Sequence, residues 1–225
     1  MTVRTLDAKR DPFHPKEDEE ETLEPEVLYL SAIGALLYLA QCTRPNISFV
    51  VNLLARYCNA PTCRHWNGVK DIFLYLKGTT DLDLFYIRES PSVAAPYGPR
   101  IDSRLVGYAD AGYLSDPHKA RFQTGHVFTI GDTAISWRPT KQMLVATSSN
   151  HAEILALHES SRECFRLREV MEHIQSTSGL TSAIDLPTTI FGDNGACIEQ
   201  LKKGYIKGDN TKHIAPKFFH SHQQQ

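Results

Sequence analysis

The sequence lacks three features that would assign it to common classes of protein. Its five cysteines form no Cys-x-x-Cys pair, and their odd number disfavours a disulfide framework. Its N-terminus carries acidic residues where a secretory signal peptide has a basic and then an apolar stretch. Its longest apolar segment, residues 27–40, is interrupted by Ser31 and Gly34 and is short for a membrane span. These absences indicate a reduced, intracellular protein with no membrane segment.

The sequence also has little net charge, −2 over 225 residues, but that charge is unevenly distributed. Residues 1–30 hold nine acids and four Lys or Arg, a balance of −5, which leaves +3 for the remainder. A polyanionic partner is therefore compatible with the rest of the chain. With 41% hydrophobic residues, a chain of this length can bury one sizeable core, or one core and a smaller helical unit.

The first part of the chain divides into three segments. Residues 1–26 are rich in acids, lysine and proline, and we expect a flexible, loosely docked segment. Residues 27–88 carry helical patterns with breaks at 43–45 and 60–61, which predict three short helices, followed by a strand at 83–88. Residues 89–103 contain several prolines and are expected to form a linker.

Residues 104–225 alternate strand and helix patterns. We expect strands at 105–110, 124–130, 133–138 and 188–193, helices at 150–174 and 194–203, and a short helix around 216–219. Gly131 and Asp132 separate the second strand from the third, which is the spacing of a two-residue hairpin. The long helix should pack one face on the sheet, because its apolar residues repeat at helical spacing. These residues are Ile154, Leu157, Cys164, Leu167, Met171 and Ile174.

Three acids lie at the ends of these expected elements. Asp110 ends the first strand and is followed by Ala-Gly, Glu153 lies at the start of the long helix, and Asp193 ends the last strand. Together they could bind Mg²⁺, a hard cation that prefers oxygen ligands, in a site that cleaves phosphodiesters. Crowding of three like charges would raise some of their pKa values in the absence of metal.

Each acid also has a purely structural interpretation. Asp110 precedes a glycine and could serve a turn. Asn150 and Glu153 have the spacing of a capping box, and Asp193 could cap the helix that follows it. One observation favours the site: Glu153 lies one turn before Leu157 on the same side of the helix, and so faces the sheet.

Six blocks of sequence surround these acids in a fixed order. They are Gly-Tyr-Ala-Asp-Ala-Gly at 107–112, Arg-Phe-Gln-Thr-Gly-His-Val-Phe at 121–128, Ile-Ser-Trp at 135–137, Lys-Gln at 141–142, Val-Ala-Thr-Ser-Ser-Asn-His-Ala-Glu at 145–153 and Gly-Asp-Asn-Gly-Ala-Cys-Ile at 192–198. Together they resemble the ribonuclease H domain of Ty1/copia-type LTR retrotransposon polyproteins.

Four blocks further upstream resemble the end of the reverse transcriptase of the same family. They are Tyr-Leu-Ser-Ala-Ile-Gly-Ala-Leu-Leu-Tyr-Leu-Ala at 29–40, Thr-Arg-Pro at 43–45, His-Trp at 65–66 and Tyr-Leu-Lys-Gly-Thr at 75–79. The paired-Asp motif of the polymerase has no match in this sequence, so we do not expect DNA synthesis.

The resemblance implies an α/β fold, a ribonuclease H-like mixed sheet flanked by helices and preceded by a small helical connection unit. It implies hydrolysis of the RNA strand of RNA–DNA hybrids during reverse transcription. Two Mg²⁺ ions, or Mn²⁺, would be held by Asp110, Glu153 and Asp193, with Asp110 bridging both. The other expected partner is the rest of a retroelement polyprotein, in cytoplasmic virus-like particles or in the nucleus.

One part of the family pattern has no match. A fourth carboxylate normally completes the site, on a helix that follows one more strand, and residues 220–225 stop before both. The sequence therefore also admits an impaired or inactive remnant that acts at most as a nucleic-acid-binding module.

Residues for nucleic-acid contact carry weaker signals. Lys202, Lys203, Lys207 and Lys212 cluster after the second helix, which suits a phosphate backbone, although a solvated basic face is the alternative. Thr147 and Ser148 precede Glu153 and could contact sugar hydroxyls, or could only shape the turn into the helix.

Overall fold

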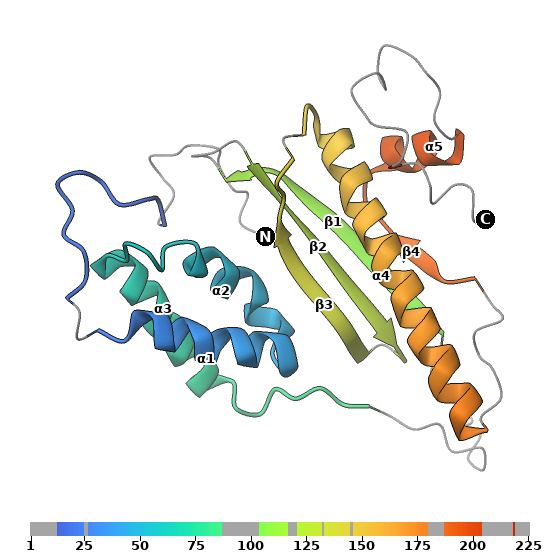
Figure 1. Ribbon diagram of the computed structural model, residues 1–225, viewed down its shortest axis with the longest axis horizontal. Helices are drawn as coiled ribbons and strands as arrows, with labels where there is room; N and C mark the ends of the chain where they lie inside the picture. The colour runs from blue at the N-terminus through green and yellow to red at the C-terminus, as the bar shows by residue number, and fades with distance from the viewer. Residues whose placement is uncertain are drawn as a thin grey trace. The chain divides into compact units, whose positions relative to one another are not determined.

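The structure is a computed structural model (Figure 1) that describes residues 13–24, 27–86, 104–116, 121–131, 133–144, 146–179, 187–203 and 218. For residues 113–116 and 121 it describes the backbone only. Contacts divide the chain into two compact units: Met1–Leu84 with Leu114–Ala120, and Phe85–Tyr113 with Arg121–Gln225. The linker expected at 89–103 lies outside the described residues.

The first unit is helical, and the three helices expected from the sequence are present. They are α1 at Tyr29–Cys42, α2 at Ser48–Ala55 and α3 at Cys63–Gly78, with the short 3-10 turn η2 at Pro45–Ile47. The helices pack around a core in which Leu36, Val51 and Leu54 are completely buried. Arg44, in the break after α1, links that break to the end of α3, because its guanidinium donates at 2.8 Å to the carbonyl oxygen of Thr79.

The described part of the acidic segment at the N-terminus is docked on the helical unit. Residues 13–24 contain no helix or strand, yet they are held against the start of α3. The phenolic hydroxyl of Tyr57 donates to the carbonyl oxygen of Phe13, and the carboxylate of Glu20 pairs with Arg64. Nε2 of His65, which is fully buried, lies 3.1 Å from the carbonyl oxygen of His14. Partners between α2 and α3 and in the first turn of α3 thus dock this segment.

The second unit contains a four-stranded sheet with strand order β3-β2-β1-β4. The strands are β1 at Leu105–Asp116, β2 at Arg121–Ile130, β3 at Thr133–Lys141 and β4 at Thr189–Phe191. β2 and β3 form an antiparallel hairpin, as expected, and the turn uses Gly131 at φ 57°. A positive φ is inexpensive for glycine, so this residue allows a two-residue turn. β4 pairs in parallel with β1, which makes the sheet mixed.

Two strands differ from their expected bounds. β1 does not end at Asp110 but continues to Asp116, because Gly112 does not adopt the positive φ that would turn the chain. The strand expected at 83–88 is absent from its described part, residues 83–86. This segment contacts β3 through side-chain hydrogen bonds instead of strand pairing. The hydroxyl of Thr133 donates to the carbonyl oxygen of Phe85, and the hydroxyl of Tyr86 donates to the carbonyl oxygen of Ala134.

The long helix α4, Ser149–Ser178, covers one face of the sheet (Figure 1). Cys164 on this helix is buried against Leu105 and Phe128, and Leu167 and Met171 pack on the same cluster. Ile174 is 52% exposed, so the apolar stripe predicted from the sequence leaves the core before the helix ends.

The remaining described elements complete the second unit. Helix α5 spans Gly195–Lys203, one residue later than expected, and packs against α4 through Cys197. Of the short helix expected around 216–219, only Phe218 is described. The expected α/β fold class is confirmed: a mixed sheet is flanked by helices and is preceded along the chain by a helical unit. Among the described helices, none is long and apolar enough to cross a membrane.

Gly107 in β1 provides a test of this packing. A Cβ atom at this position would lie 2.6 Å from Cε1 of Phe128, a ring that is completely buried. We expect Gly107→Ala to lower the free energy of unfolding by about 1–3 kcal/mol through overpacking. The matched control is Gly125→Ala in β2, where a Cβ would meet nothing within 4 Å and the change should stay within about 1 kcal/mol. Urea unfolding measures both, and equal effects would contradict the packing.

Candidate metal centre

Asp110 lies in the middle of β1, where strand alternation exposes it. Its neighbours Ala109 and Ala111 are buried toward α4, whereas Asp110 and Tyr108 project from the opposite face of the sheet and are exposed. Since the strand runs on past Asp110, the side chain serves no turn. The structure thus removes the turn interpretation of this acid.

Glu153 lies in the second turn of α4 and is only 7% exposed. The N-cap of α4 is Ser148, whose hydroxyl accepts a hydrogen bond of 3.1 Å from the backbone N–H of His151. The capping box considered for Asn150 and Glu153 is therefore wrong, because Asn150 is already inside the helix. Glu153 is left without a capping role and faces β1.

Asp193 lies two residues after the end of β4 and is exposed. The residue after it, Asn194, caps α5, since its Oδ1 accepts a hydrogen bond of 3.0 Å from the backbone N–H of Cys197. Asp193 is thus not the cap. The parallel register pairs Tyr108 with Phe191, and Asp110 and Asp193 each come two residues later in the chain, Asp193 just beyond the end of β4. The register of β1 and β4 therefore brings these two acids to the same level of the sheet.

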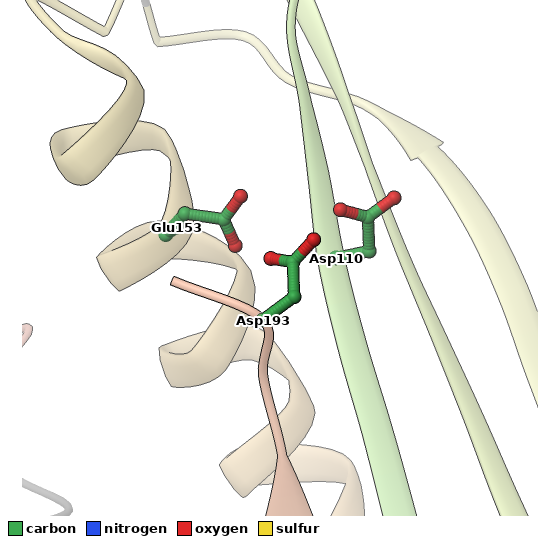
Figure 2. Close-up of side chains that lie close together, drawn as sticks. All are labelled: Asp110, Glu153 and Asp193. Atoms are coloured by element: carbon green, nitrogen blue, oxygen red, sulfur yellow. The ribbon is translucent and has the colours of Figure 1, made fainter. Parts of the chain in front are cut away.

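The three acids converge, as the sequence predicted. One carboxylate oxygen from each of Asp110, Glu153 and Asp193 lies within 4.8 Å of the other two. Figure 2 shows Glu153 and Asp193 pointing toward β1, from α4 and from the end of β4, with the carboxylate of Asp110 next to that of Asp193. In the part of the chain that the structure describes, this is the one group of three or more acids, histidines or cysteines with such spacing.

The electrostatics of the group reflect crowded negative charge. Burial raises the pKa of Glu153 to about 7, and the charges of Asp110 and Asp193 add to that increase. Burial and then the charge of Asp193 also raise the pKa of Asp110. A hydrogen bond from the backbone N–H of Ala111 opposes both increases. Near neutral pH and without a cation, Glu153 therefore holds a proton in a large fraction of molecules.

This donor set fits a divalent cation. Carboxylate oxygens are the ligands that Mg²⁺ and Mn²⁺ prefer, and a cation among them would offset the repulsion that raises these pKa values. The buried Cys197 nearby is no competing ligand, since burial and then the charge of Glu153 raise the pKa of its thiol to about 12.

The residues predicted to contact nucleic acid lie outside the acid cluster. Thr147 and Ser148 are exposed, but both are engaged locally: Ser148 caps α4, and the N–H of Thr147 lies 3.3 Å from Nδ1 of His151. Lys202 and Lys203 are exposed in the last turn of α5, and Nζ of Lys202 lies 3.4 Å from the carboxylate of Glu199. The other two predicted residues, Lys207 and Lys212, lie outside the described residues.

Sequence reasoning missed two polar residues that shape the site. Asn194 caps the helix next to Asp193, and its signal was present, because asparagine before glycine at a helix start is a common cap. Asn150 donates a hydrogen bond to Gln200, 50 residues away, and no local pattern points to that contact.

Replacing Glu153 tests the electrostatics. Its pKa is raised in the folded state, so the folded protein favours the protonated form, and stability falls as pH rises from about 4.5 through 7. Glutamine mimics the protonated acid. We expect Glu153→Gln to stabilise the metal-free protein by about 1–3 kcal/mol at pH 8, with little effect near pH 4.5.

Urea unfolding in the presence of a chelator at the two pH values measures this difference. Glu172→Gln, an exposed change on the same helix, should shift stability by no more than about 0.5 kcal/mol. A Glu153→Gln effect that is the same at both pH values would contradict the assigned charge crowding.

Replacing Ser148 tests its role as the cap of α4. Ser148→Ala should lower the free energy of unfolding by about 1 kcal/mol, because the backbone N–H of His151 loses its acceptor. Ser149→Ala, one residue later and equally exposed, should change stability by less than about 0.5 kcal/mol. Unchanged stability in Ser148→Ala would contradict the capping role.

The relatives found by sequence comparison come from the same family that the sequence motifs resemble. No protein-family model matches the chain. The retrovirus-related Pol polyprotein from transposon TNT 1-94 of Nicotiana tabacum is 32% identical over 200 residues, 89% of this chain and 14% of the polyprotein. The Transposon Ty1-JR1 Gag-Pol polyprotein of Saccharomyces cerevisiae is 27% identical over 143 residues, 64% of this chain and 8% of the polyprotein.

A third relative is much shorter. The Secreted RxLR effector protein 161 of Plasmopara viticola is 34% identical over 137 residues, which are 61% of this chain and 89% of that protein. Among solved structures, LC11-RNase H1 in complex with an RNA/DNA hybrid gives a TM-score of 0.35 at 18% identity, and the match covers 54% of this chain and 78% of that one.

The match to the tobacco polyprotein runs over nearly the whole chain, although the chain spans only 14% of that polyprotein. The chain belongs to the family of retrovirus-related Pol polyproteins from Ty1/copia-type transposons.

Proposed function

We propose that this chain hydrolyses the RNA strand of RNA–DNA hybrids in a reaction that depends on divalent metal ions. The observation that carries the proposal is the meeting of Asp110, Glu153 and Asp193, whose carboxylate oxygens lie within 4.8 Å of one another. The family supports it, because its members are retrotransposon Pol polyproteins, and reverse transcription produces such hybrids.

The three acids would hold two Mg²⁺ ions, with Mn²⁺ as a possible substitute. When bound, these ions would supply an activated water and offset the negative charge on the phosphodiester. Asp110 and Asp193 are exposed, so they can reach ions that also contact a phosphate at the surface. Glu153 is buried, so its carboxylate can anchor an ion from the protein side.

The substrate would be bound mainly through its phosphates. Lys202 and Lys203 follow Asp193 by nine and ten residues, and α5 carries them roughly 10–15 Å from the acids. Two exposed cations at that distance suit phosphates a few nucleotides away from the scissile one. Thr147 and Ser148, exposed just before the helix that carries Glu153, are proposed to contact the sugar hydroxyls.

A second function, binding of hybrids without cleavage, is favoured by one observation. The cluster contains three acids among the described residues, whereas the family pattern has four. In either function the chain would act inside a cell, in a virus-like particle or a nucleus, together with other parts of a retroelement polyprotein.

A cleavage assay on a labelled RNA–DNA hybrid with Mg²⁺ or Mn²⁺ tests the proposal. We expect cleavage of the RNA strand that a chelator stops and that Asp110→Asn lowers by at least about 100-fold, since even residues that only support metal ligands cost roughly 10–100-fold. The matched control is Asp71→Asn, an exposed acid of α3, which should cleave like the unsubstituted chain.

The same samples distinguish the two functions. Salt-sensitive binding of the hybrid without any cleavage would identify the binding module. If the chain neither binds nor cleaves the hybrid, both functions are excluded.

A further inference from the structure

Helices α4 and α5, which position two of the three acids, meet through a small apolar contact. Ile154 of α4 and Cys197 of α5 are completely buried against each other, and Leu157 and Leu201 pack beside them. Apolar contacts of this kind are not directional, and two helices can slide or rotate slightly at little cost while keeping the same area buried. This contact alone does not define how far α5 lies along α4.

A hydrogen bond between the two helices determines the position of α5 along α4. Nδ2 of Asn150 on α4 donates to Oε1 of Gln200 on α5. A hydrogen bond depends steeply on distance and angle, so this pair defines one register of the two helices. Asn150 is partly buried, and its Oδ1 has no solvent contact and no hydrogen-bond partner among the described residues.

Both ends of this hydrogen bond are rigidly connected to the acids. Asn150 and Glu153 are three residues apart on α4, so they share one face of the helix. Gln200 belongs to α5, which Asn194 caps through its side chain, and Asn194 directly follows Asp193. A shift of α5 along α4 would therefore move Asp193 relative to Glu153.

We infer that Asn150 and Gln200 are positioning residues, and that their hydrogen bond holds Asp193 beside Glu153 in the geometry that binds metal. Neither residue belongs to the acid cluster. The inference rests on the proposed function for its use, but the geometric claim concerns the protein alone. The bond opposes a repulsion, because Asp193 and Glu153 carry like charges when Glu153 is ionised and no cation is present.

The first experiment measures affinity for Mn²⁺ alone, by the fraction of free Mn²⁺ in electron paramagnetic resonance, with the full chain. Gln200→Ala and Asn150→Ala should each weaken binding by about 10-fold, the range found for residues that support metal ligands. The double variant should bind no worse than either single variant, because both remove the same bond.

Leu201→Ala is the matched control at the same interface. It removes apolar packing next to Gln200 but leaves the hydrogen bond, so it should lower the urea midpoint without the 10-fold loss of Mn²⁺ affinity. An equal loss in Leu201→Ala, unchanged affinity in both single variants, or losses that multiply in the double variant would each overturn the inference.

A second experiment needs no metal, and so separates this inference from the proposed function. If the bond holds two repelling carboxylates together, cutting it relieves repulsion, and that relief is absent once Glu153 is neutral. At pH 8 and with a chelator present, the urea midpoint shift caused by Gln200→Ala should therefore be larger in the Glu153→Gln background than in the unsubstituted chain. Equal shifts would mean that the bond only joins two helices, which overturns the inference.

The two experiments together show whether the metal site or the positioning role is wrong. If the unsubstituted chain binds Mn²⁺ no better than Asp110→Asn, the metal site of the proposed function is wrong, and the stability comparison alone then decides the role of the pair. If Mn²⁺ binds and the stability shifts are equal, the metal site stands and the positioning role is wrong.

Discussion

The structure depends on one unfavourable interaction, the repulsion among three carboxylates whose oxygens lie within 4.8 Å of one another. Burial of Glu153 increases this repulsion, because a buried carboxylate lacks the water that would screen its charge. The folded chain partly avoids the cost by taking up a proton, as the pKa of Glu153, raised to about 7, indicates. Such a group is stable only if the surrounding elements are fixed by contacts made elsewhere.

Those contacts come from three directions. The parallel register of β1 and β4 brings Asp110 and Asp193 to one level of the sheet. Caps at both helix starts, Ser148 for α4 and Asn194 for α5, hold the segments on which Glu153 and Asp193 lie. The site is therefore assembled by backbone pairing between two strands and by two side-chain caps, and the acids themselves are left free of structural roles.

Much of this could be predicted from the sequence, and the failures have physical causes. Strand alternation, helical periodicity and the hairpin spacing at Gly131 identified the main elements of the second unit. The end of β1 was misplaced, because glycine permits a turn without requiring one, and Gly112 stays extended. The partners that dock residues 13–24 were not predicted, since Tyr57, Arg64 and His65 lie far along the chain. Local patterns do not contain such long-range contacts.

The register of β1 links the hydrophobic core to the acid cluster. Strand alternation places Gly107, Ala109 and Ala111 on the face that packs under α4, and it thereby places Asp110 on the other face. A slip by one residue would bury Asp110 and expose the small residues. Phe128 prevents that slip, because its buried ring lies where any side chain at position 107 would project, and only glycine leaves room for it. A core contact three residues away thus decides on which face of the sheet the first carboxylate appears, which makes the packing of one aromatic ring a condition for the metal site.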